Sequence, residues 1–147
     1  MPTTDPQSTF GSKTVTLAQA SATAGEHLVV PLWLPFLTSG PTDVQQAVSG
    51  EGAIVTITRY QDPNSEQWAM IHQFHIAQHN QTGPTVLRQV TVDSVPVTLF
   101  ELSVSAAGST SKILGAFWTH RLTAKSVELQ THGVSEADLL RVAASIE

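Results

Sequence analysis

The strongest constraint on the fold is a series of short segments between residues 53 and 131 in which apolar and polar side chains alternate. Alternation with a period of two is typical of strands that bury one face, and these segments are rich in β-branched residues. Clusters of Gly, Pro, Asn, Asp and Ser separate them at short intervals, so consecutive strands are expected to pair as antiparallel neighbours. The sequence therefore predicts an antiparallel sheet of about six strands in a meander, over residues 53–60, 68–78, 86–93, 96–104, 113–122 and 127–131.

An amphipathic helix is predicted after the last strand. Ser135 is a suitable N-cap, and Glu136 and Asp138 lie in the first turn, where the helix dipole favours acids and Asp138 takes the capping-box position. The apolar residues recur at helical spacing as one stripe, made of Leu139, Leu140, Val142, Ala143 and Ile146. We expect this helix to lie on one face of the sheet, with Leu139 or Leu140 against the face that carries Trp118.

The segment before the strands is expected to hold a tail, a short helix and a connector. Residues 1–13 are rich in Pro, Thr, Ser and Gln and predict a flexible tail or linker, which leaves residues 14–147 as a single α+β domain. The alanine-rich stretch 14–26 predicts a short helix that Gly25 ends. Residues 28–35 are apolar but carry two prolines, so we expect a buried extended connector.

The composition excludes several classes of site. The chain contains no cysteine, so disulfides, thiolate metal sites and thiol nucleophiles are ruled out. Its net charge is −5 and it has no cluster of Lys or Arg, which argues against nucleic acid as a partner. The amino-terminal residues lack the basic start and apolar stretch of a signal peptide, and the longest apolar run, residues 28–37, is too short to span a bilayer. We expect either a cytosolic protein or the soluble part of a longer one.

Four motifs taken together resemble a known group of proteins. They are the proline-flanked segment Val29–Pro35, the tryptophan segment Leu114–Trp118, the segment Val127–Leu129, and the capped helix Gly133–Ile146. This arrangement over residues 14–147 resembles an uncharacterised bacterial domain family, found behind the membrane span of anti-sigma-factor-like proteins and in exported lipoproteins. The resemblance implies an extracytoplasmic sensing or binding domain, the soluble part of a longer membrane-anchored protein, and brings no catalytic residues.

The histidines give one candidate metal site. His72, His75 and His79 would lie on one face of a helix, where they could hold a metal ion. In a strand, His72 points to one face while His75 and His79 point to the other. The alternating large residues from Trp68 to Ile76 favour the strand, so no metal or other cofactor is predicted.

Other chemistries have weaker support. The segment Ser109–Lys112 matches a Ser-x-x-Lys tetrad, but it falls in an expected turn between strands. Asp93 and Glu101, on either side of a hairpin, are the best carboxylate pair for acid–base work. The three tryptophans, Trp33, Trp68 and Trp118, are expected to be core residues, and the strand pattern points His72 and His120 inward.

These observations predict a non-enzymatic extracytoplasmic binding or sensory module. Its partner would be a protein or an apolar ligand, and any membrane tether would lie outside this chain. The first alternative is a lipid or lipoprotein-carrier-like domain in which a curved sheet and a helix enclose an apolar cavity. The second alternative is a metal-dependent hydrolase that uses His72, His75 and His79.

Overall fold

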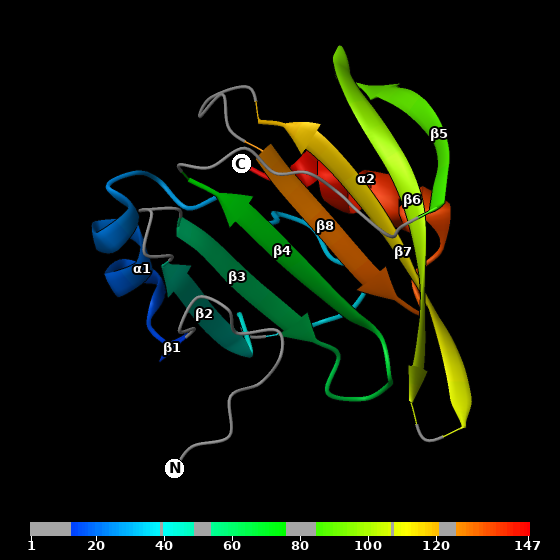
Figure 1. Cartoon of the computed structure of the whole chain (residues 1–147), viewed down its shortest axis with the longest axis horizontal. Helices are drawn as coiled ribbons and strands as arrows, with labels where there is room; N and C mark the ends of the chain where they lie inside the picture. Colours follow the sequence, from blue (N-terminus) through cyan, green and yellow to red (C-terminus); the bar gives the residue numbers. More distant parts are fainter. Residues whose placement is uncertain (1–12, 39, 49–53, 76–84, 107, 121–125) are drawn as a thin grey trace.

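The computed structural model describes residues 13–38, 40–48, 54–75, 85–106, 108–120 and 126–147. These residues form one eight-stranded antiparallel sheet and two helices (Figure 1), which confirms the predicted α+β class. The elements in chain order are β1 (Lys13–Thr14), α1 (Leu17–Ala24), β2 (Asp43–Val48), β3 (Ile54–Gln61), β4 (Trp68–Phe74), β5 (Thr85–Val92), β6 (Val95–Ala106), β7 (Ser109–Thr119), β8 (Ser126–His132) and α2 (Glu136–Ser145).

The sheet consists of two four-stranded meanders that meet at its centre. The first meander is made of β1 to β4 and the second of β5 to β8. The strand order is β1-β2-β3-β4-β8-β7-β6-β5, so β4 pairs with β8 and not with the next strand in the chain. The predicted six-strand meander is therefore wrong in two respects. It lacks β1, which includes Lys13 of the predicted tail, and β2, and it makes β4 and β5 neighbours. Regular spacing predicts neighbours only where connections are short, whereas β5 lies at the edge of the sheet with β8, β7 and β6 between it and β4.

One face of the sheet, the helix face, carries the main core. α2 and the connector after α1 lie behind the sheet in the view of Figure 1. Leu139 is fully buried and Leu140 half-buried, and Leu139 shares one apolar cluster with Trp118, as the sequence predicts. Ser135 caps α2, since its hydroxyl accepts a hydrogen bond from the Asp138 amide at 3.2 Å. The helix is therefore docked on the sheet through the predicted stripe.

The connector of residues 27–36 joins the end of α2 to the sheet. Val30 and Glu147 exchange backbone hydrogen bonds of 3.0 Å, and the Ser145 hydroxyl accepts from the Leu32 and Trp33 amides. The Arg141 guanidinium lies 4.0 Å from the centre of the Trp33 ring, a cation–π contact on the outer side of α2. The connector predicted for residues 28–35 is buried only at Leu28 and Val29, whereas Leu32 is exposed, so the prediction that the whole segment is buried is wrong. Through these hydrogen bonds the connector holds the last turn of the helix.

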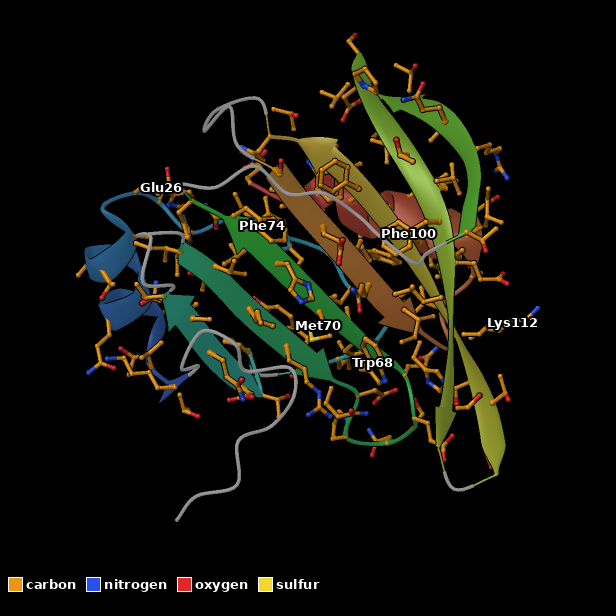
Figure 2. All side chains as sticks on the ribbon, in the orientation of Figure 1. Glu26, Trp68, Met70, Phe74, Phe100 and Lys112 are labelled. Carbon is orange, nitrogen blue, oxygen red and sulfur yellow. The ribbon has the colours of Figure 1, made fainter. Side chains whose placement is uncertain are left out.

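The opposite face, here called the far face, carries the large side chains of β4. Trp68, Met70 and Phe74 run in a row along this strand (Figure 2), while the alternate residues Ala69 and Ile71 belong to the helix-face core. His72 lies in the row of large residues, half-buried, so the prediction that it points to the core beneath the helix is wrong.

The first helix begins and ends as local sequence rules require, although it is shorter than residues 14–26. Thr16 and Gln19 form a complete capping box, and Gly25 ends the helix with φ +72°, a conformation that glycine adopts without strain. Within the described residues, neither helix has the length and apolar character needed to cross a bilayer.

Candidate functional site

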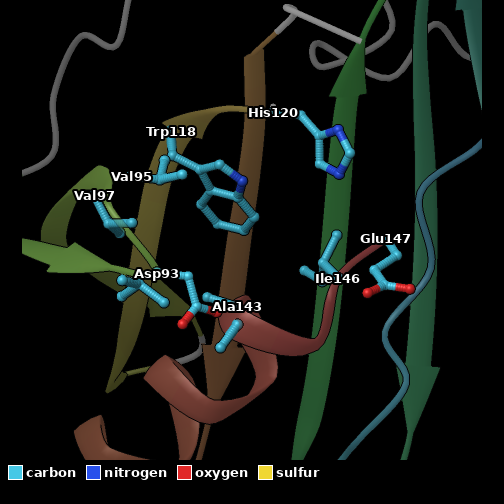
Figure 3. Close-up of a pocket in the computed structure, with 10 residues that line it drawn as sticks. Asp93, Val95, Val97, Trp118, His120, Ala143, Ile146 and Glu147 are labelled. Atoms are coloured by element: carbon cyan, nitrogen blue, oxygen red, sulfur yellow. The ribbon is translucent and has the colours of Figure 1, made fainter. Parts of the chain in front are cut away.

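A pocket of about 350 Å³ opens on the helix face between the second meander and the end of α2 (Figure 3). Four parts of the chain build it: the turn between β5 and β6, the start of β6, the end of β7 and the residues around the end of α2. Its lining residues are Val92, Asp93, Val95, Val97, Trp118, His120, Ala143, Ala144, Ile146 and Glu147. All of them come from the second half of the sequence.

The walls of the pocket are apolar. Trp118 lies on β7 with its indole on the helix face, 7% exposed, and Val97 of the neighbouring strand is 2% exposed. Ile146, just after α2, completes the wall and is buried. Its backbone is held in place by an antiparallel bridge with Pro31 of the connector. A pocket with these walls gains its binding free energy mainly from burying apolar surface.

Asp93 reaches the pocket because of an unusual turn. Val92 pairs with Val95, so Asp93 and Ser94 form a two-residue hairpin loop. Their φ angles are 49° and 68°, the left-handed conformation that a type I′ turn requires at both positions. Aspartate tolerates this region better than most residues, and the turn leaves Asp93 exposed at one side of the pocket.

His120 and Glu147 form the polar part on the other side. His120 is 5% exposed, and burial lowers the pKa of its imidazole, with a smaller contribution from nearby His27. A hydrogen bond to the Ile146 backbone and the charge of Glu147 partly oppose this effect. The ring is therefore neutral at pH 7. Because one ring N–H donates to the Ile146 carbonyl, the other nitrogen of the neutral ring is a hydrogen-bond acceptor.

A second polar cluster lies inside the protein, near α1. The Glu26 carboxylate bonds to Nδ1 of His75, and Nε2 of His75 lies 2.7 Å from the Thr56 hydroxyl. Gln46 donates to the same hydroxyl at 3.2 Å, and Nδ1–H of His75 donates to the Glu26 carboxylate. A carboxylate, an imidazole and a hydroxyl in this order resemble a nucleophilic triad. Thr56 is 1% exposed and His75 is fully buried, so we assign the cluster a structural role in holding α1 and the segment after it to the sheet.

Sequence reasoning missed this cluster because Glu26 and Thr56 carry no local signal. The two residues are brought to His75 by pairing between β3 and β4 and by the return of the chain after α1. The one available signal was the position of His75 in the alternation of β4, on the face opposite the large side chains.

The three histidines of the candidate metal site do not share a face in the described structure. His72 lies on the far face with Nδ1 at 3.8 Å from Oε2 of Glu128, and His75 lies buried on the helix face. The predicted strand is confirmed over Trp68–Phe74. His75 follows the strand as a bend, and residues 76–79, which include His79, lie outside the described residues. Within the described ranges, no three His, Cys, Asp or Glu side chains are placed to hold a metal ion.

The remaining sequence candidates are separated in the fold. Asp93 lies in the turn that closes the β5–β6 hairpin, whereas Glu101 is opposite Thr85 at its open end and pairs with Lys112 at 3.6 Å. The Ser109–Lys112 tetrad begins strand β7, with Gly108 before it in the turn, so it is not helical.

The tryptophans divide between the two faces. Trp118 is a core residue as predicted, and Trp33 packs half-buried against the core. Trp68 lies half-buried on the far face, where it stacks on His132 with ring centres 5.9 Å apart, so its assignment to the core is wrong.

Comparison with known proteins adds no further constraint. The chain matches no protein-family model, no curated protein and no solved structure at a significant level. The resemblance to the extracytoplasmic family of anti-sigma-factor-like proteins therefore stays a prediction.

Proposed function

We propose that this domain is a non-enzymatic binding module, and that it takes a small, largely apolar ligand in the pocket between the β5–β6 turn, Trp118 and the end of α2. The observation that carries the proposal is the pocket itself. Its volume of about 350 Å³ falls in the range of small-molecule sites, about 300–1,000 Å³. Apolar walls with a few polar groups at the rim are the usual composition of such sites.

A binding role also accounts for where the polar groups lie. The groups that have the order of a catalytic triad lie in Thr56, His75 and Glu26, and of these the hydroxyl of Thr56 and the imidazole of His75 are buried away from solvent, while Glu26 is half-buried. The polar groups that line the pocket are two carboxylates and an imidazole with a lowered pKa. This set can orient a ligand through hydrogen bonds and charge.

The position of the pocket fits a sensory role in an extracytoplasmic domain, the function that we infer from the sequence. A ligand there contacts the last turn of α2, and that turn is bonded through Ser145 and Glu147 to the connector of residues 27–36. Occupancy would therefore bias the position of the connector. A lipid-carrier role is the second candidate, favoured by the apolar walls, and it would be limited to short ligands by the volume of the pocket.

Ligand binding can be tested by screening a library of small aromatic and aliphatic compounds and following amide chemical shifts by NMR. We expect hits to shift resonances around Trp118, His120 and Ile146. Ala144 is exposed and lines the pocket, so Ala144→Leu should fill the opening and abolish these hits. Ala137→Leu is the matched control, since Ala137 is also exposed on α2 but does not line the pocket. Hits that survive Ala144→Leu, or a screen with no hit, would contradict the proposal.

A further inference from the structure

The two edges of the sheet differ in how much backbone they offer to another strand. β5 (Thr85–Val92) forms one edge, and β1, with only two residues, forms the other (Figure 1). Within the described residues β5 pairs only with β6, so one side of its backbone faces away from the sheet. We propose that β5 is a dimerisation edge, which pairs antiparallel with β5 of a second copy of this chain. This inference goes beyond the proposed function and does not depend on it.

The turn after β5 fixes which backbone groups point outward. Because the loop between Val92 and Val95 has two residues, this pair exchanges the first two hydrogen bonds of the hairpin. Hydrogen-bonded pairs then alternate along the ladder, so the N–H and C=O groups of Gln89 and Thr91 point away from β6. Pro96, which has no N–H, lies opposite Thr91 and agrees with this phase. The outer edge therefore offers two donors and two acceptors to a second strand.

The side chains along this edge are also open to solvent. Every residue from Thr85 to Gln89 is exposed. Of the large apolar side chains that are exposed in the described part of the chain, two lie here, Val86 at 61% and Leu87 at 44%. Natural proteins avoid a long edge strand with exposed apolar residues, because it is a template for pairing with another chain. The composition of this edge therefore favours a strand partner.

Two features that block edge strands in other proteins leave most of this edge free. Arg88 is the one charged residue of β5, and its guanidinium is held to Glu136 of α2 at 2.5 Å. The ion pair draws the charge toward the helix and partly neutralises it. The β-bulge between Val86 and Arg88 interrupts the register with β6 only near the start of the strand, and the pairing from Arg88 to Val92 is regular. Five residues thus remain for a regular ladder.

The partner is an identical copy, because β5 is complementary to itself. In an antiparallel pair, the side chains that meet lie on the same face of the sheet. Val90 and Val92, which pack against the helix-face core, would meet the same apolar residues of the second copy. Gln89 and Thr91, on the far face, would meet each other. Since β1 is too short to serve as the partner edge, copies would close in pairs related by a twofold axis.

Sedimentation velocity of the whole chain over a range of concentrations tests the dimer. We expect the contact to bury less than the roughly 1,200 Å² of a stable interface, so the dimer should be reversible, with a dissociation constant in the micromolar range. Hydrogen exchange locates the contact. The amides of Gln89 and Thr91 gain hydrogen bonds in the dimer, so their exchange should slow as the protein concentration rises.

Two variants assign the dimer to β5. Gln89→Pro removes an outward N–H and places its ring in the path of the second strand, and it takes no backbone hydrogen bond from the β5–β6 pair. We expect it to raise the dissociation constant at least about tenfold. Val86→Lys replaces an exposed apolar side chain by a charge and should also weaken the dimer. Val48→Lys is the matched control, since Val48 is exposed at 41% on β2 in the first meander.

The outcomes decide the inference without involving the pocket. A chain that stays monomeric up to millimolar concentration overturns the dimer and leaves the edge to a strand of another protein. A dimer that neither β5 variant weakens, or that Val48→Lys weakens equally, also overturns it. Assemblies that grow without limit would mean that copies join through two different edges, which contradicts a closed pair. If Gln89→Pro does not fold, Val86→Lys decides the result alone, and in every case the proposed function is tested separately by the ligand screen.

Discussion

The buried hydrogen-bonded chain of Glu26, His75 and Thr56 allows a sharp test of how α1 is held to the sheet. Thr56→Val keeps the shape of the side chain and its preference for a strand, and it removes only the hydroxyl. Nε2 of His75 then loses its partner at 2.7 Å. Gln46 loses one acceptor and keeps its bond to the Ala20 carbonyl at 3.0 Å. The substitution therefore leaves one ring nitrogen without its partner in the interior.

The cost follows from that ring nitrogen and from the Gln46 N–H that loses its acceptor. A buried polar group that loses its hydrogen bond destabilises the folded state by about 1–3 kcal/mol. Since valine fills the volume of threonine, no cavity term is added. Against a total stability of about 5–15 kcal/mol for a domain of this kind, the loss is measurable and leaves the protein folded.

Urea unfolding followed by tryptophan fluorescence measures the change in the free energy of unfolding. Thr58→Val is the matched control, because Thr58 is equally buried two positions along the same strand and takes no part in this chain of hydrogen bonds. We expect Thr56→Val to cost at least about 1 kcal/mol more than the control. If the two variants unfold at the same urea concentration with equal slopes, the cluster does not hold α1 to the sheet and its structural assignment is wrong.

Three further predictions follow from packing and burial. Leu139→Ala should lower the free energy of unfolding by about 2–5 kcal/mol in urea unfolding, because Leu139 is fully buried. Leu140→Ala should lower it clearly less, because Leu140 is half-buried. The reverse order of the two losses would mean that α2 is rotated on the sheet. Gly115→Ala should lower the melting temperature, because a Cβ atom there would overlap the Phe100 ring across the strand pair, and an unchanged melting temperature would show that the ring moves aside freely. Because the pKa of His120 is lowered in the folded state, the unfolded state binds more protons below the ordinary pKa of about 6.5, so stability should fall as the pH drops through this value. His120→Gln should flatten this dependence in denaturation curves recorded from pH 7 downward, and a profile that stays equally steep would assign the effect to another group.

The sequence predicted those parts of the fold that depend on neighbouring residues. The alternation of Trp68, Met70, His72 and Phe74 identified strand β4, and the Ser135 cap with its apolar stripe identified α2. These features arise from backbone geometry and side-chain periodicity over a few residues, so a single sequence contains them. The pairing of β4 with β8 joins residues far apart in the chain, and no local pattern specifies it.

The choice of face was also beyond local reasoning. Large alternating side chains suggested that Trp68 and His72 point to the core beneath the helix, but it is Ala69 and Ile71 that share the apolar cluster of the connector and α2. Alternation shows that two faces differ and does not say which one a distant helix covers. For the candidate pocket the situation is similar. Asp93 and His120 were singled out separately, and only the fold brings them to one pocket with Glu147.

The division of the sheet into two meanders has a consequence for how the domain would respond to a ligand. Every residue that lines the pocket belongs to the second meander or to the chain around the end of α2, and none of them belongs to β1, β2, β3 or β4. Bound ligand would therefore slow amide hydrogen exchange in β6, β7 and the last turn of α2, and exchange in β2 and β3 would change little. Under the proposed function, the first meander would serve as a fixed support, and local opening of the second meander would be the motion that a ligand suppresses.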